Sequence, residues 1–180
     1  VDLFEEAGIP DGVINLVTGD GPTTGQPLVE HPDVAGIAFT GSREVGVGIE
    51  ETFREHGKRG PVIAELGGKN PVIVSNQADI DDAVDGVLNG AFSFGGQKCS
   101  ATSRVYVYED VIDSFTDKLV KKTEQLVVGP PENRETFVSP LINDDAFHRY
   151  QRISQRARAD GRILTGGSPV DDTELPDGRY

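Results

Sequence analysis

The only cysteine of the chain, Cys99, lies in the polar, glycine-rich stretch FSFGGQKCSA. A structural cysteine is usually buried in an apolar element, whereas this stretch is typical of a turn after a helix. A thiol attacks only as the thiolate, which needs a positive or dipolar environment. Lys98 is adjacent, and nearby backbone N–H groups could stabilise an oxyanion. For a cysteine considered alone, an incidental free thiol is still the simpler interpretation.

A carboxylate, Glu65, ends the apolar run PVIAEL. In such a place it must be paired, hydrated, or have its pKa raised by desolvation. A carboxylate with a raised pKa is a useful general base near neutral pH. The alternative is a side chain that points into solvent at the end of a strand, and for Glu65 by itself this is the simpler interpretation.

Two glycine-rich turns, GDGPTTG and TGSREVG, each lie between an expected strand and an expected helix. Such turns can bring backbone N–H groups and a helix N-terminus close to a phosphate. Neither is a P-loop, because no Gly-Lys-Ser/Thr follows. Tight turns without a ligand are the alternative. The residues concerned are Gly19, Gly21 and Gly25 in the first turn and Gly41, Ser42 and Gly46 in the second.

The three histidines, His31, His56 and His148, stand far apart and lack ligand spacing with Cys99, so we expect no metal site. None is near Cys99 in sequence, which leaves Glu65 as the candidate base. The arginine-rich stretch 148–162 is most simply a solvated helix face.

The net charge of −13, from 30 acidic and 17 basic residues, argues against nucleic acid and against an anionic membrane as partners. The acidity is spread along the chain. Asp exceeds Glu and Arg exceeds Lys, which is typical of a high-salt cytoplasm but equally of an ordinary acidic protein. No run approaches a membrane span, and one cysteine cannot form an internal disulfide, so a reducing cytoplasm is expected. The chain begins without Met, and we expect it to be a piece of a longer polypeptide.

The chemistry-bearing residues alternate with regular elements. Short apolar runs predict strands at 12–19, 34–41 and 61–66, with a short helix after the first run and a helix over 42–57. This order, β-α-β-α-β, predicts an open, parallel α/β sheet. Val45, Ile49 and Phe53 recur every four residues on the second helix.

The alternation of predicted strands and helices continues in the rest of the chain. Strands are predicted at 71–75, 104–109 and 162–167, and helices from Asp79 or Asp81 to about Phe94, at 111–126 and at 144–159; a Pro-rich connection fills 129–143. Two adjacent glycines between strands make a natural hinge, so we predict domains at 1–67 and 68–180.

Taken together, the sequence motifs described above are specific enough to indicate a protein family. The segments ELGGKNPVIV and FSFGGQKCSATSR, with AFTGSREVG before them, resemble the aldehyde dehydrogenase superfamily in motif, order and spacing over essentially the whole chain. The resemblance implies an α/β fold: residues 1–67 are the C-terminal part of a Rossmann-like NAD(P)-binding domain, and residues 68–180 the N-terminal part of the catalytic domain.

The resemblance also implies roles. Cys99 is the nucleophile that forms a thiohemiacetal and then a thioester, its backbone N–H is half of an oxyanion hole, and Glu65 activates the hydrolytic water. Gly41, Ser42 and the helix that contains Gly46 approach the cofactor pyrophosphate. Near the adenine are expected Val45, Gly21, Pro22 and Gly25, and near the nicotinamide Leu66 and Gly67.

Several groups that the family requires are absent from these 180 residues: an oxyanion-hole Asn and ribose-binding residues on both sides of the segment. We therefore predict that the chain alone is inactive, that NAD is the cofactor with NADP not excluded, and that the full-length protein is a homo-oligomer acting on a small aldehyde.

Within the family, Lys98, Ser100, Ala101 and Arg43 favour the 1-pyrroline-5-carboxylate dehydrogenases, which convert glutamate semialdehyde to glutamate in proline catabolism; Ser100 is a candidate substrate contact. The alternatives are a succinate-semialdehyde or broad-specificity dehydrogenase, a non-catalytic scaffold that kept the fold, and a truncated product without function.

Overall fold

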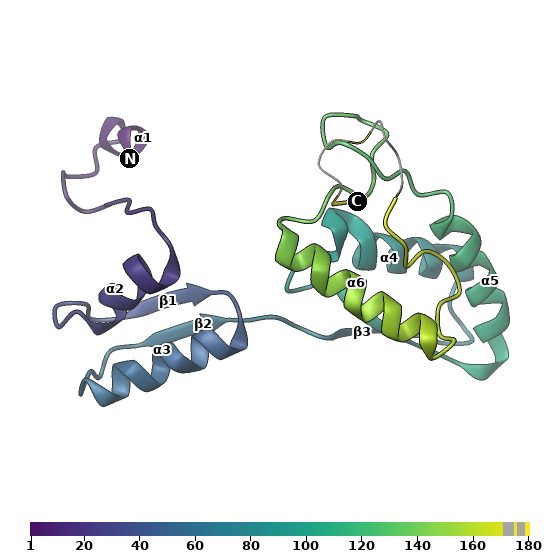
Figure 1. Ribbon diagram of the computed structural model, residues 1–180, viewed down its shortest axis with the longest axis horizontal. Helices are drawn as coiled ribbons and strands as arrows, with labels where there is room; N and C mark the ends of the chain where they lie inside the picture. Colours follow the sequence, from purple (N-terminus) through teal and green to yellow (C-terminus); the bar gives the residue numbers. More distant parts are fainter. Residues whose placement is uncertain (171–174, 176–178) are drawn as a thin grey trace. The chain divides into compact units, whose positions relative to one another are not determined.

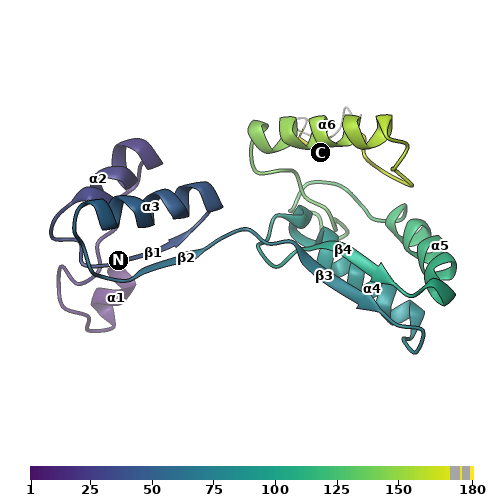
Figure 2. The ribbon, with the colours of Figure 1, turned by 90° about the horizontal axis from the view of Figure 1, so that it is seen from below.

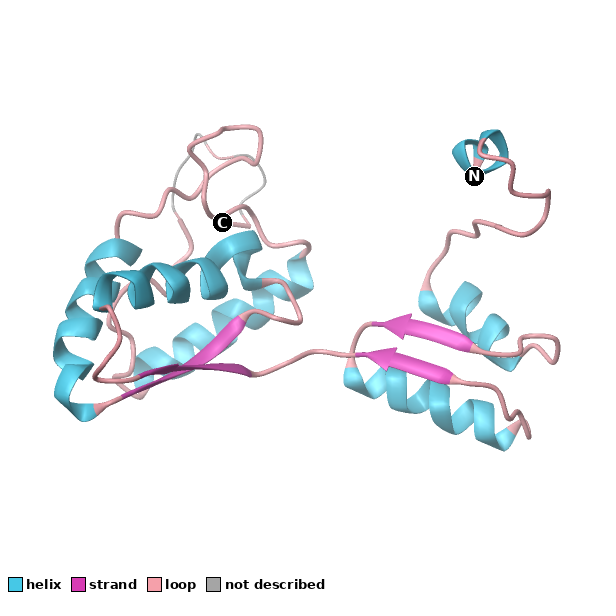
Figure 3. Ribbon diagram, turned by 180° about the vertical axis from the view of Figure 1, so that it is seen from behind, coloured by secondary structure: helices cyan, strands magenta, loops and turns pink. Residues whose placement is uncertain are grey.

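The computed structural model describes residues 1–170, 175 and 179–180. The chain forms two compact units, Val1–Gly67 and Gly68–Tyr180. Each contains one pair of parallel strands connected through a helix, and the two pairs are seen in magenta in Figure 3. The predicted α/β class is confirmed, and each unit is described by itself below.

In the first unit, strand β1 (Ile37–Thr40) pairs in parallel with β2 (Val62–Glu65), so that Thr40 lies opposite Glu65. Helix α3 (Arg43–Glu55) connects the two strands (Figure 1). It begins at Arg43 because the Ser42 hydroxyl accepts a hydrogen bond from the Val45 backbone N–H at 3.2 Å, which satisfies one of the unpaired first-turn donors.

The core of the first unit is small. Val29 of helix α2 (Gln26–Glu30) and Ile49 and Phe53 of α3 are buried. They pack on Ile37, Phe39 and Val62, and α2 and α3 therefore cover the same face of the strand pair, as Figure 2 shows. Val45, predicted on this apolar stripe, is instead half exposed. The remaining elements are helix α1 (Asp2–Glu6) and a π-helical turn η1 (Gly21–Gly25).

In the second unit, β3 (Asn70–Val74) pairs in parallel with β4 (Thr102–Val107), with a register irregularity between Asn70 and Pro71. Helix α4 (Ile80–Phe92) connects them and is capped by Asp79, whose carboxylate accepts from two backbone N–H groups. The other elements are the 3₁₀ turns η2 (Ser93–Gly96) and η3 (Glu109–Val111) and the helices α5 (Ile112–Thr123) and α6 (Asp144–Ala159).

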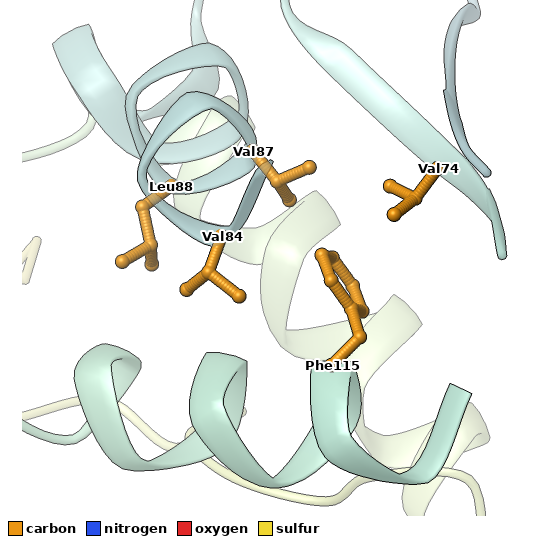
Figure 4. Close-up of a cluster of buried hydrophobic side chains, with 5 residues drawn as sticks. All are labelled: Val74, Val84, Val87, Leu88 and Phe115. Carbon is orange, nitrogen blue, oxygen red and sulfur yellow. The ribbon is translucent and has the colours of Figure 1, made fainter. Parts of the chain in front are cut away.

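The core of the second unit joins β3, α4 and α5. Val84 and Leu88 of α4 lie above Phe115 of α5, and the Phe115 ring points toward Val74 of β3 (Figure 4). With Val87 these are five buried side chains, against three in the first unit. Burial of each such side chain contributes roughly 1.5–3 kcal/mol to stability. The packing of β3, α4 and α5 therefore gains more stability from apolar burial than the packing of the first unit.

Two predicted strands do not form. Residues 12–19 are irregular, and Leu16 and Val17 are 76% and 64% exposed. A strand needs a neighbour for its backbone N–H and C=O groups, and within the described residues β1 and β2 pair only with each other. Residues 162–167 are irregular, with a bend at 164–165, and Gly166 and Gly167 adopt left-handed φ angles of 68° and 77° that do not fit an extended strand.

The other predicted helices and strands are confirmed to within a few residues, and α6 matches its predicted bounds. Among the described residues, no helix combines the length and apolar character needed to span a bilayer.

Candidate active site

The thiol of Cys99 is exposed, in a tight turn immediately before β4. The backbone N–H of Ala101 donates to the Lys98 carbonyl at 3.1 Å and closes this turn. Within the described residues the Cys99 N–H has no acceptor. The turn therefore presents a free thiol and a free amide on one residue, and Ser100, also exposed, follows directly.

The turn is held from the start of β3. The Asn70 side-chain amide donates from Nδ2 to the Cys99 carbonyl at 2.7 Å and to the Ala101 carbonyl at 3.3 Å. Gly68 makes room for this contact, because a Cβ at that position would lie 2.5 Å from the Cys99 carbonyl oxygen. The backbone of the Cys99 turn is therefore fixed by a residue 29 positions earlier in the sequence.

The segment before the turn is unusual in its backbone. Phe94, Gly95 and Gly96 have left-handed φ angles of 59°, 62° and 68°. For Phe94 this conformation is strained. The Gln97 side chain donates to the Phe94 carbonyl at 3.3 Å and accepts from the Ile142 N–H at 2.9 Å, so it connects this segment to the chain before α6.

Lys98, which the sequence places next to the thiol, contacts an aromatic ring with its ammonium group. Its ammonium lies 5.3 Å from the centre of the Phe94 ring, in a cation–π contact. A cavity of about 820 Å³ borders Phe94 to Gln97, but neither Lys98 nor Cys99 lines it. The group of this turn that is available to stabilise negative charge at Cys99 is therefore the backbone N–H of Cys99.

In the first unit, Glu65 is exposed at the carboxyl end of β2. Its carbonyl accepts from the Gly41 N–H at 3.0 Å, and Thr40 lies opposite it in the register. The parallel pairing thus gathers Glu65, Gly41 and Ser42 at one edge of the strand pair, the edge at which doubly wound sheets bind ligands.

The N-terminus of α3 lies at the same edge. Ser42 occupies the Val45 amide, while the amides of Arg43 and Glu44 find no acceptor in the part of the chain that the structure describes. Gly46 is buried where a Cβ would lie 2.7 Å from Leu66 Cδ2, so the glycine lets α3 pack closely on the end of β2. Two free amides at a helix N-terminus fit an anionic group such as a phosphate.

The first glycine-rich turn fits a phosphate less well. The Asp20 carboxylate accepts from the Thr23 N–H and hydroxyl, and the Asp20 carbonyl accepts from Thr24 and Gly25. The hydrogen bond from the Thr23 hydroxyl to the carboxylate, and after it the one from the Thr23 N–H, hold the pKa of Asp20 below its usual value. A charged carboxylate and occupied amides leave Gly21, Pro22 and Gly25 as contacts for a neutral group such as a base.

The structure thus brings Glu65, Leu66, Gly41, Ser42 and Gly46 together in the first unit. Val45, on α3 of the same unit, is half exposed. Cys99 and Ser100 lie in the second unit. Gly67 is exposed at the end of the first unit. In the described residues no cluster of three or more His, Cys, Asp or Glu side chains could hold a metal ion.

Two further residues of the candidate site were not predicted from the sequence: Asn70 and Gln97. Both have side-chain amides that form hydrogen bonds with backbone groups of the Cys99 turn or of the segments next to it. The available signal was position, because Asn70 follows the ELGGK motif and Gln97 precedes Cys99 by two residues.

Comparison with known proteins gives the family. All 180 residues match the aldehyde dehydrogenase family. The chain is 42% identical over 177 residues to the 1-pyrroline-5-carboxylate dehydrogenase of Anoxybacillus flavithermus, a region covering 95% of this chain and 34% of that protein. It is 40% identical over 175 residues to the Bacillus subtilis protein of the same name, with the same coverage. The chain thus spans about a third of these relatives.

Solved structures agree. Betaine aldehyde dehydrogenase from Staphylococcus aureus, crystallised with NAD⁺, superposes with a TM-score of 0.92 and 34% identity over 99% of this chain and 35% of that chain. PnpE in complex with nicotinamide adenine dinucleotide gives a TM-score of 0.92 and 38% identity over 99% of this chain and 37% of that chain. This chain belongs to the aldehyde dehydrogenase family.

Proposed function

We propose that the full-length protein oxidises an aldehyde to a carboxylate with NAD, using Cys99 as nucleophile and Glu65 as the base for hydrolysis. The observation that carries the proposal is the Cys99 turn, with an exposed thiol and, on the same residue, a backbone N–H that has no acceptor among the described residues. The match to the aldehyde dehydrogenase family over the whole chain supports it.

The proposed reaction has two stages. The Cys99 thiolate attacks the aldehyde carbon, a C–S bond forms, and the carbonyl oxygen becomes an oxyanion that the Cys99 N–H can bind. A bound NAD would supply the acceptor for the hydride of this carbon, and Cys99 would then hold the carbon as a thioester. Glu65 then takes a proton from water, the resulting hydroxide attacks the thioester, and cleavage of the C–S bond releases the carboxylic acid.

The first unit fits the pyrophosphate of such a cofactor. The free amides of Arg43 and Glu44 at the α3 N-terminus, next to Gly41 and Ser42, are suited to hold it. In this assignment residues 1–67 carry the cofactor and residues 68–180 the nucleophile.

For the substrate we propose L-glutamate 5-semialdehyde, which is in equilibrium with 1-pyrroline-5-carboxylate. The support is the name shared by relatives 39–42% identical to this chain. Ser100, exposed beside the nucleophile, is the candidate contact for the substrate.

The test uses the full-length protein with NAD and compares 1-pyrroline-5-carboxylate with succinate semialdehyde and a simple alkyl aldehyde. We expect Cys99→Ser to lower the rate of NADH formation by about 10³-fold or more, because alcohols are far weaker nucleophiles than thiolates. In Glu65→Gln one burst of NADH should form, followed by slow turnover, because the thioester persists.

Glu51→Gln, the same chemical change on the exposed face of α3, is the matched control and should behave as wild type. Undiminished oxidation by Cys99→Ser would refute the covalent mechanism. A preference for succinate semialdehyde would refute the substrate assignment alone.

A further inference from the structure

We propose that Asn70 is a positioning residue for the nucleophile: by holding the Cys99 carbonyl it fixes the direction in which the thiol points. The inference rests on the proposed role of Cys99. It concerns a residue that touches neither substrate nor cofactor in the mechanism above, and that acts through the backbone of the turn.

The argument begins with the two peptide groups that flank the Cys99 Cα. The one before it is fixed because the Lys98 carbonyl accepts from the Ala101 N–H at 3.1 Å. The one after it is fixed because the Cys99 carbonyl accepts from Asn70 Nδ2 at 2.7 Å. Peptide groups are planar, so fixing both planes fixes the Cα–Cβ bond of Cys99, and only rotation about that bond is left to the thiol.

The same geometry orients the amide of Cys99. In a trans peptide the N–H points opposite to the carbonyl of the preceding residue, and the described residues contain no cis peptide bond. Because the Lys98 carbonyl points into the turn toward Ala101, the Cys99 N–H points out of it. Thiol and oxyanion donor are thus set by the two hydrogen bonds together.

Only an uncharged amide suits this position. Both hydrogens of Asn70 Nδ2 are used, on the carbonyls of Cys99 and Ala101. An aspartate has the same shape but would place an acceptor against two acceptors. The backbone of Asn70 opens β3 and pairs with Thr102, so the side chain projects from a rigid element.

Gly68 provides an independent way to disturb the same contact. A Cβ there would lie 2.5 Å from the Cys99 carbonyl oxygen and 2.7 Å from Asn70 Nδ2. Gly68 has no left-handed φ, so alanine adds no strain of that kind, and its Cβ must displace the Cys99 carbonyl or the Asn70 amide.

The experiment measures steady-state kinetics of full-length Asn70→Asp, Asn70→Ala and Gly68→Ala. Misplacement of a reacting group by about 1 Å can cost about 10²-fold. We therefore expect kcat to fall about 10–100-fold in all three, with KM for NAD unchanged. The controls are Asn76→Asp, which alters an amide paired with Asp110 after the other end of β3, and Gly86→Ala, which adds a Cβ into open space on α4.

A second readout does not depend on catalysis. In the peptide that contains residues 97–101, exchange of the Ala101 amide, which donates to the Lys98 carbonyl, should be about 10-fold faster or more in Asn70→Asp than in Asn76→Asp, because the turn loses its anchor. Should Asn70→Asp fail to fold, Gly68→Ala tests the same contact.

The outcomes separate the two proposals. If the wild-type protein oxidises no aldehyde, the proposed function fails, and exchange at residues 97–101 still decides whether Asn70 holds the turn. If the wild type is active while Asn70→Asp keeps both its kcat and its slow exchange, the positioning role is wrong. An equal loss in Asn76→Asp, or a rise in KM for NAD without a change in kcat, would also overturn it.

Discussion

Both units of the chain are built as strand, helix, parallel strand, yet they hold their candidate chemistry at opposite ends of the strands. In the first unit, Glu65 and the Gly41–Ser42 turn lie at the carboxyl ends of β1 and β2. In the second unit, Cys99 lies before the amino end of β4, beside the first residue of β3.

The difference lies in how far the supporting contacts reach along the sequence. Ser42 is bonded to Val45, three residues away, and the strand register is set by apolar runs. The Cys99 turn is bonded to Asn70, 29 residues away. A helix start can therefore be inferred locally, whereas the orientation of a turn between helix and strand depends on what the fold packs beside it.

The largest effect should come from the cores. Phe53 and Phe115 are each 2% exposed, the first among three buried side chains and the second among five. We expect Phe53→Ala and Phe115→Ala each to cost about 3–5 kcal/mol of unfolding free energy, because a cavity is left in each core. Urea unfolding of the full-length protein measures this.

Phe53→Leu and Phe115→Leu, which keep most of the volume, should each cost less than about 1.5 kcal/mol. If Phe53→Ala costs less than about 1 kcal/mol, the small first core collapses around the cavity. The prediction that the two cores lose a similar free energy of unfolding would then be wrong.

An intermediate effect is expected at the two helix N-caps, Ser42 of α3 and Asp79 of α4. Loss of the cap by Ser42→Ala or Asp79→Ala should each destabilise by about 1 kcal/mol, with Asp79 the more costly because it accepts from two amides.

The caps should differ in function. Ser42→Ala should raise KM for NAD, because Ser42 lies at the proposed cofactor edge, while Asp79→Ala should leave KM and kcat unchanged. If the two variants changed NAD binding equally, the claim that only Ser42 lies at the cofactor site would be wrong.

The smallest effect concerns acid stability. Hydrogen bonds from the Thr23 hydroxyl and N–H hold the pKa of Asp20 below its ordinary 3.8, and the Lys118 ammonium does the same for Asp81. A carboxyl whose pKa is lower in the folded state stabilises the fold above pH 3.8, and this contribution is lost as the pH falls through the lowered value.

Asp20→Asn and Asp81→Asn should therefore each flatten the fall in stability below pH 3.8. At 1 M salt, where the Debye length is about 3 Å, the effect of Asp81→Asn should shrink because its donor is charged, and that of Asp20→Asn should persist. Stability curves at low and high salt check this, and equal salt sensitivity would contradict it.

Much of the fold follows from local pattern. Apolar periodicity predicted the helices α3, α4, α5 and α6 and the strands β1 to β4. The prediction succeeded because the residues that form an amphipathic face or a cap lie close together in the sequence of a single element. It failed at residues 12–19, where an apolar run finds no partner strand among the described residues, and at 162–167, where Gly166 and Gly167 adopt left-handed φ angles. Whether a strand finds a partner depends on the tertiary structure, and the apolar run alone does not reveal it.

For the candidate site the division is similar. Residue type and spacing were enough to predict the nucleophile and base candidates, Cys99 and Glu65, the glycine-rich turn before α3, and the family. The contacts of the folded chain were needed to show that Asn70 holds the Cys99 carbonyl, that Lys98 faces Phe94, and that Asp20 accepts hydrogen bonds within the first glycine-rich turn. The direction of a side chain depends on neighbours that folding alone brings within hydrogen-bonding distance.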